Sequence, residues 1–133
     1  MNRLNETILQ EMNKYLDGTT IEEILLANRK LFRYRVSFTQ EELNQEIDVL
    51  DLSVRASNCL KRYGFHTLDH LVNGVYTKED ATSKRQLLRI RNLGKGTADE
   101  ILLKLFFYQF QILPETEKKA YMQQVQEANK KTA

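Results

Sequence analysis

The sequence predicts an all-α protein. Residues that cap helix N-termini recur along the 133-residue chain, and Glu or Gln stands three positions after several of them, which completes a capping box. Between the caps, apolar residues recur at spacings of three and four, as they do on one face of a helix. Only one proline interrupts the chain. Together these observations favour a set of short helices.

The first segment, residues 1–45, predicts two or three short helices. Apolar residues at helical spacing indicate a first helix that ends near Gly18; they are Leu4, Ile8, Met12 and Tyr15. Thr20 and Glu23 form a capping box for a second helix, which we expect to include Leu31. Helices this short are marginal alone in water, so we expect them to pack on the core, on a second copy or on a partner.

Residues 32–38 alternate apolar and polar side chains with a period of two. This pattern is typical of a short strand or of an extended link, and no pairing partner is evident in the sequence. Thr39 and Glu42 then form another capping box, which predicts a short helix that leads into the middle of the chain.

The middle segment, residues 46–113, has the densest helix signals. Ser53 is placed to cap a helix that ends at Gly64, and Thr67 is placed to cap the next one. A polar loop is expected over residues 75–82, followed by a tight turn over residues 92–96. Two further capping boxes predict the helices after the loop and after the turn: Ser83 with Gln86, and Thr97 with Glu100.

Pro114 is placed to end the last of these helices. The remaining tail, residues 114–133, is polar and has only weak apolar periodicity. We therefore expect it to be helical or frayed.

The formal net charge of +2 is divided unevenly. Residues 1–47 hold six basic and eight acidic side chains, whereas residues 48–113 hold ten basic and seven acidic ones. Five basic residues occur with no acid among them: Lys84, Arg85, Arg89, Arg91 and Lys95. Such a run is often only a solvated face, but it is also the pattern of a surface that binds a polyanion.

Several classes of protein are excluded. No apolar run approaches the roughly 20 residues of a membrane span, and the charged start is unlike a secretory leader. One cysteine permits no internal disulfide, and with two His it argues against a zinc site. No phosphate-binding loop, zinc-protease motif or nucleophile elbow occurs. We expect a cytoplasmic, non-enzymatic protein without a metal or cofactor.

A turn of small residues joins two expected helices over residues 88–97. In such a helix-hairpin-helix turn, backbone N–H groups at the start of the second helix point outward, where the positive end of the helix dipole also lies. Gly94 and Gly96 are expected to adopt positive φ and to let a phosphate approach closely. Lys95 lies between them, and Arg91 lies at the entrance. The alternative is a plain connector between core helices.

A second candidate surface lies on the helix that Ser53 caps. Arg55 falls in its first turn, where the helix dipole disfavours a cation. Asn58 and Cys59 follow three and four positions later and share the face of Arg55. This combination suits contacts with phosphates or base edges; the alternative is an exposed arginine beside a buried cysteine.

The two motifs together resemble a known family. L-x-x-S-V-R-x-x-N-C-L-K, which begins at Leu50, followed by R-N-L-G-K, which begins at Arg91, is similar to the C-terminal domain of the bacterial RNA polymerase alpha subunit. The resemblance covers residues 46–113. It implies a compact helix-hairpin-helix (SAM-like) bundle, here with an N-terminal helical extension over residues 1–45. It also implies binding to the minor groove of A/T-rich double-stranded DNA and docking onto sigma factor and transcription activators.

The resemblance assigns roles to residues of this protein. Arg55 corresponds to the principal DNA contact of the family. The other expected DNA contacts are Asn58, Cys59, Arg91, Asn92, Gly94, Lys95, Gly96 and Thr97. Glu100 is expected to cap a helix and to position Arg55, because a carboxylate repels phosphate.

The sequence departs from the family pattern at three places. Gly96 stands where many members have a second basic residue, and the loop over residues 74–85 is longer than usual. The residues before Asp48 are too few for the assembly domain of an alpha subunit, so we expect a free-standing relative.

The leading hypothesis is a non-enzymatic DNA-binding module that acts in bacterial transcription. The alternative is a protein-interaction adaptor, which binds RNA polymerase, sigma factor or a transcription regulator without binding DNA. Gly96 and the acidic first segment favour the adaptor. A helix-hairpin-helix accessory of DNA repair would explain the turn but not the Arg55 face.

Overall fold

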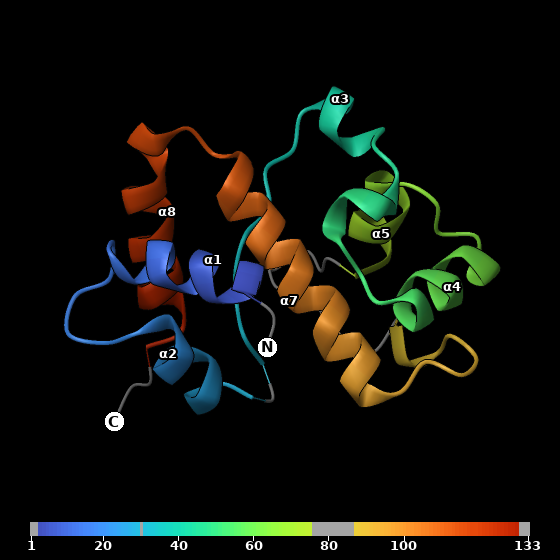
Figure 1. Cartoon of the computed structure of the whole chain (residues 1–133), viewed down its shortest axis with the longest axis horizontal. Coiled ribbons are helices and arrows are strands. Elements are labelled where there is room, and N and C mark those ends of the chain that lie inside the picture. Colours follow the sequence, from blue (N-terminus) through green and yellow to red (C-terminus); the bar gives the residue numbers. More distant parts are fainter. Residues whose placement is uncertain (1–2, 30, 76–86, 131–133) are drawn as a thin grey trace.

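A long helix, α7, forms the axis of the molecule. The computed structural model describes residues 3–29, 31–75 and 87–130. Helix α7 (Lys95–Ile112) crosses the molecule between two groups of helices (Figure 1). One group contains α3 (Gln40–Leu43), the 3₁₀ helix η1 (Ile47–Leu50), α4 (Val54–Tyr63) and α5 (Leu68–Val75); the other contains α1 (Arg3–Asn13), α2 (Ile21–Ala27) and α8 (Glu115–Ala128).

Helix α7 takes this place because its side chains are apolar on nearly all sides. Its buried residues are Ala98, Ile101, Leu102, Leu105, Phe106, Phe107, Gln109 and Phe110. A helix that is apolar all round has to be covered on every face. The two groups of helices supply that cover, and their buried residues join those of α7 in one continuous apolar cluster.

The all-α prediction is confirmed. Within the described ranges, β pairing is limited to an isolated antiparallel bridge between Glu46 and Thr67. Thr39 and Glu42 form the expected capping box, in which each side chain accepts a bond from the backbone N–H of the other. Gly64 ends α4 with a φ of 102°, in the left-handed region that glycine adopts without strain.

Three helix boundaries differ from the sequence prediction. Helix α1 ends at Asn13, so Tyr15 and Gly18 lie beyond its end. Helix α2 ends at Ala27, short of Leu31, because the amide of Asn28 donates to the carbonyl of Ile24 and closes the last turn. Helix α7 begins at Lys95, with Gly94 as its N-cap, and so starts before Thr97. Residues 83–86, where the helix after Ser83 is expected to begin, and most of the loop before them lie outside the described residues; Leu87 and Leu88 of this expected helix are helical.

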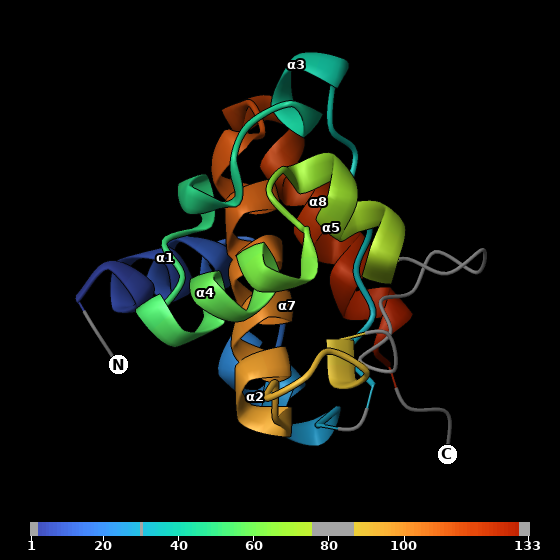
Figure 2. The same cartoon turned by 90° about the vertical axis from the view of Figure 1, so that its right-hand side faces the viewer.

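Residues 31–39 are an extended link and not a strand. Figure 2 shows the link running from α3 at one end of the molecule toward α2 at the other. The rings of Phe32 and Tyr34 pack on Phe106 of α7, with ring centroids 4.9 Å and 5.1 Å away. The Tyr34 hydroxyl donates to the carbonyl of Leu102 at 2.6 Å. The alternation of apolar residues thus reflects one face packed on α7, without a neighbouring strand.

Asn129, which caps the C-terminus of α8, makes hydrogen bonds to the link of the kind that a neighbouring strand would make. Its Oδ1 accepts a hydrogen bond from the backbone N–H of Arg33 at 2.8 Å, and its Nδ2 donates to the carbonyl of Arg33 at 2.7 Å. The side chain is buried and also donates to the carbonyl of Val125. One amide thereby satisfies both backbone groups of a link residue.

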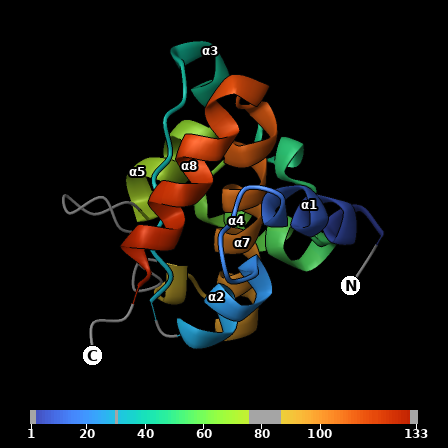
Figure 3. The same ribbon diagram turned by 90° about the vertical axis from the view of Figure 1, so that its left-hand side faces the viewer.

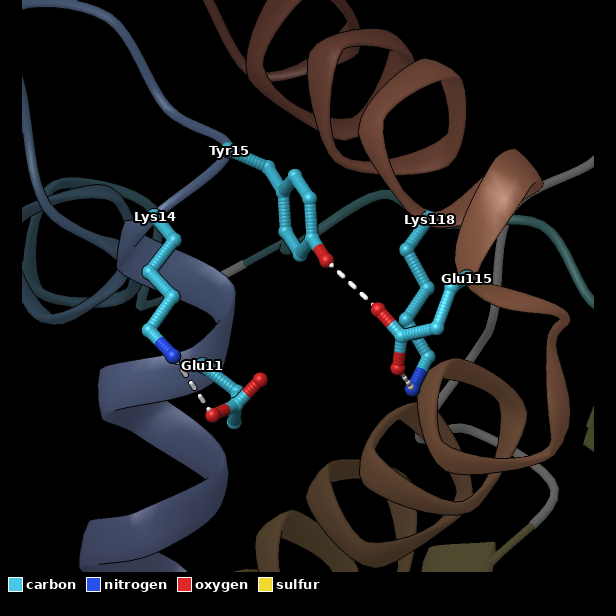
Figure 4. Close-up of polar contacts among 5 residues, drawn as sticks. All are labelled: Glu11, Lys14, Tyr15, Glu115 and Lys118. Atoms are coloured by element: carbon cyan, nitrogen blue, oxygen red, sulfur yellow. Dashed lines mark hydrogen bonds and ion pairs between the residues drawn. The ribbon is translucent and has the colours of Figure 1, made fainter.

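Helices α1 and α2 of the first segment pack on α8 and α7 of the same chain (Figure 3). The Tyr15 hydroxyl donates to Glu115 at 2.9 Å, and Lys118 lies 3.1 Å from the other oxygen of that carboxylate (Figure 4). The hydrogen bond from Lys118, followed by that from Tyr15, lowers the pKa of the Glu115 carboxyl. Bonding to Glu115 raises the pKa of Tyr15. The tail expected to be helical or frayed is therefore an ordered helix over Glu115–Ala128.

Lys104 connects the two groups of helices from the side of α7. Its Nζ lies 3.2 Å from Oδ1 of Asn5 on α1 and 3.7 Å from the carboxylate of Asp51, which follows η1. The Lys104 side chain is 11% exposed, so this ammonium is largely shielded from water. In the described ranges, no helix combines the length and the apolarity needed to cross a membrane.

We predict that Asn129→Ala lowers the free energy of unfolding by about 1–3 kcal/mol, because it leaves the backbone groups of Arg33 without partners. Urea denaturation followed by circular dichroism measures this change. Lys130→Ala, at the exposed neighbouring position, is the matched control and should unfold like the unmodified protein. Equal midpoints for the two variants would show that the amide does not hold the link.

Candidate nucleic-acid interface

The candidate interface is built where the start of α4, the turn before α7 and the start of α7 meet. Ser53 caps α4, and its hydroxyl accepts a hydrogen bond from the backbone N–H of Ala56 at 3.2 Å. Arg55 lies two residues after this cap and is exposed. Its guanidinium has no hydrogen bond or ion pair with any other described residue. A cation at this unfavourable end of the helix dipole, without a partner there, is available to an anion from outside.

Glu100 of α7 fixes the start of α4. One carboxylate oxygen accepts the backbone N–H of Ser53 at 2.7 Å, and the other accepts the Ser53 hydroxyl at 2.9 Å. The expected capping box of Glu100 with Thr97 is therefore wrong, because both oxygens of the carboxylate are directed to α4. Glu100 therefore holds Ser53, the N-cap of the helix that carries Arg55.

Cys59 joins α4 to the turn. Its thiol is 6% exposed and donates to the backbone carbonyl of Asn92, with the sulfur and oxygen 3.7 Å apart. Cys59 is thus buried against the turn, and its expected contact with DNA stays a prediction. Arg55 and Asn58 are exposed and Cys59 is buried, which is the arrangement of the alternative, an exposed arginine beside a buried cysteine.

The residue of the turn that has a left-handed backbone conformation is Asn92 and not a glycine. Asn92 has a φ of 67°, a conformation that asparagine tolerates better than most residues. Gly94 has a φ of −87°, in the ordinary region, and the expectation of positive φ is wrong for both glycines of the turn. Ile90 and Leu93 on either side of Asn92 are buried and anchor the turn. Arg91 and Asn92 are exposed as a result.

The N-terminus of α7 is open. Its N-cap is Gly94, which has no side chain to bond the first N–H groups, and the first helical bond runs from Ala98 to Gly94 at 3.0 Å. The N–H groups of the three residues between them precede that bond, as in any first turn. Lys95 is exposed beside them, and a Cβ added at Gly96 would meet nothing within 4 Å. The arrangement suits a phosphate, which needs donors, positive charge and space.

The structure thus brings most of the expected residues to one region. Arg55, Asn58, Arg91, Asn92 and Lys95 are exposed, and Thr97 is half-buried in the first turn of α7. Arg91 and Lys95, like Arg55, have no hydrogen bond or ion pair with another described residue. Sequence reasoning missed the pairing of Ser53 with Glu100. These residues are 47 positions apart, and no local pattern links them.

The part of the chain that contains these residues matches a known protein family. The family described as the C-terminal domain of the alpha subunit of bacterial RNA polymerase matches residues 36–106, slightly more than half of the 133 residues. The protein belongs to this family. The match begins near the end of the link and ends within α7, so it contains Arg55, the turn and Glu100. It leaves out α1, α2 and α8 of this alpha C-terminal domain protein.

Curated relatives agree with the family assignment. The DNA-directed RNA polymerase subunit alpha of Clavibacter sepedonicus is 47% identical over 64 residues, which are 48% of this sequence and 17% of that protein. The same subunit of Malacoplasma penetrans is 41% identical over 70 residues, which are 53% of this sequence and 19% of that protein. The chain thus spans less than a fifth of the length of either relative. No solved structure matches it.

We predict that Glu100→Ala lowers the free energy of unfolding by about 1–2 kcal/mol, because two hydrogen bonds to Ser53 are lost. Thermal or urea denaturation measures the loss. Glu100→Gln keeps one oxygen acceptor and should fall between Glu100→Ala and the unmodified protein. If Glu100→Ala were as stable as the unmodified protein, the carboxylate would not hold the start of α4.

Proposed function

We propose that this alpha C-terminal domain protein is a non-enzymatic DNA-binding module of bacterial transcription. In this proposal residues 46–113 bind DNA, and residues 1–45 and 114–133 hold α7 in place. The observation that carries the proposal is a cluster of exposed cations beside the open N-terminus of α7. Arg55, Arg91 and Lys95 have no hydrogen bond or ion pair with another described residue. Some cations elsewhere, Lys61, Lys104 and Lys118, are paired with carboxylates.

The groups of this cluster differ in what they offer to DNA. The first turn of α7 and Lys95 form a compact donor site of the kind that suits one phosphate. Arg55 lies on another helix, α4. Its long side chain has no hydrogen bond or ion pair with another described residue. The minor groove of A/T-rich DNA is narrow and strongly negative, and it favours an inserted arginine. We therefore propose that Arg55 enters the minor groove while the turn binds the phosphates beside it.

We predict that Arg55→Ala weakens binding to an A/T-rich duplex by at least tenfold, of the order of one good arginine contact. Fluorescence anisotropy with labelled A/T-rich and G/C-rich duplexes measures the affinity and the preference between them. The substitution should also reduce the A/T preference, because the groove contact carries it. Circular dichroism should show an intact fold, since Arg55 has no described partner.

Lys119→Ala is the matched control for charge. Lys119 is exposed on α8, and its replacement removes the same unit of charge from another helix. It should leave the affinity within about twofold at moderate salt, where distant charges are screened. Unchanged affinity in Arg55→Ala, or no binding of DNA by the unmodified protein, would contradict the proposed function.

A second candidate is a protein-interaction adaptor that binds RNA polymerase, sigma factor or a transcription regulator without DNA. A cleft of about 570 Å³ between α2 and α8 favours it. Asp17, Glu23 and Glu127 line the cleft, and Lys130 is the basic residue among the lining residues. Ile24 and Ala27 of α2 are the apolar residues of the lining. An acidic, partly apolar surface of this kind repels DNA and suits a basic protein segment.

A pull-down with purified RNA polymerase holoenzyme, beside the DNA titration, separates the two candidates. For the adaptor, we predict that the unmodified protein retains polymerase and that Glu23→Lys combined with Glu127→Lys abolishes retention by charge repulsion. Retention that survives the double charge reversal would exclude the cleft as the docking surface. The DNA-binding module predicts that the same double variant binds DNA at least as well as the unmodified protein.

A further inference from the structure

Arg62 lies on the same face of α4 as Arg55. The two residues are seven positions apart, which is about 20° short of two full helical turns. Arg62 is exposed and, like Arg55, has no hydrogen bond or ion pair with another described residue. Its neighbour Lys61 points elsewhere: its Nζ lies 3.0 Å and 3.3 Å from the two carboxylate oxygens of Asp48. Of these adjacent cations, Arg62 is the one left for an external anion.

The position of Arg62 relative to the turn is set by Cys59. The thiol of Cys59 contacts the backbone of Asn92, so this is the point at which α4 touches the turn. Arg55 lies four residues before that point, and Arg62 lies three residues after it. Asn58, also exposed, lies between the two arginines on this face. The guanidinium groups therefore stand on either side of the contact between α4 and the turn.

The separation of the two arginines decides which part of DNA each would reach. Seven residues of α-helix rise about 10.5 Å, whereas the minor groove of B-DNA is about 6 Å wide. If α4 crosses the groove with Arg55 inserted, Arg62 falls beyond the edge of the groove, where the phosphates lie. We propose that Arg62 is a second DNA anchor on α4, which binds a backbone phosphate next to the groove that Arg55 enters. This inference rests on the proposed DNA-binding function.

A purely structural role for Arg62 has a different consequence. A cation in the last turn of a helix is stabilised by the helix dipole, and Lys61 and Arg62 share that turn. If the dipole were the only role of Arg62, its replacement would change stability and not DNA affinity. Replacement of Lys61 would then have an equal or larger effect on stability, because it also breaks the bridge to Asp48.

The test compares Arg62→Ala with Lys61→Ala, which removes the same charge one position away. Anisotropy titrations use A/T-rich and G/C-rich duplexes at several salt concentrations. Arg62→Ala should weaken binding about three- to tenfold on both duplexes and reduce the slope of log affinity against log salt by about one, as loss of one phosphate contact does. Lys61→Ala should change the affinity less than twofold. Arg55→Ala, in contrast, should reduce the A/T preference.

The inference is overturned if Arg62→Ala binds DNA like the unmodified protein, or if Lys61→Ala weakens binding as much as Arg62→Ala. If Arg55→Ala still weakens DNA binding, either result contradicts only the role of Arg62 and not the proposed DNA-binding function. A selective loss on A/T-rich DNA in Arg62→Ala also overturns it, since a phosphate contact does not read sequence. Failure of the unmodified protein to bind either duplex removes the proposed function and the inference together.

Discussion

The burial of α7 from all sides is the constraint on which the rest of the structure depends. Its apolar residues face both groups of helices, so neither group alone can cover it. Helix α7 packs on α4 and η1, and it begins directly after the turn. Phe106, in the C-terminal half of α7, packs against Phe32 of the link and Tyr121 of α8. Because one rigid helix joins the two halves, α1, α2 and α8 support the helix whose first turn lies in the candidate interface.

Electrostatics divides the molecule into two kinds of surface. Where cations stabilise the fold they are paired, as Lys104 is with Asp51 across the side of α7. At the candidate interface, the helix starts present positive dipole ends, and Arg55, Arg91 and Lys95 stand near them without described partners. Such an arrangement is unfavourable for the isolated protein, because like charges gather where the dipole already repels them. An anionic ligand would relieve that repulsion, and for this reason the region suits binding better than a structural role.

Local residues decided much of the fold. The caps at Thr20, Thr39 and Ser53 and the left-handed end at Gly64 lie where the sequence placed them, because each bond joins residues only a few positions apart. The paired motifs around Arg55 and Arg91 indicate the family. The exposure of Arg55 follows from the polar face of a short amphipathic helix, and that of Arg91 from its place in the turn. The sequence predicts Thr97 as the cap of α7, but the helix begins at Lys95 after Gly94. A glycine cap has no side chain that a sequence pattern could reveal.

The sequence by itself determined the helical elements and the family to which residues 36–106 belong, because helix caps and family motifs are local patterns. Only the tertiary structure decided what Glu100, Cys59 and the link do. Glu100 bonds to Ser53, Cys59 is buried against Asn92, and Tyr34 bonds to Leu102, each through a partner far away in the sequence. Such choices depend on which side chains the packing of α7 brings within bonding distance. No local pattern encodes them, since a carboxylate or thiol of given sequence context bonds to whatever donor or acceptor the fold presents.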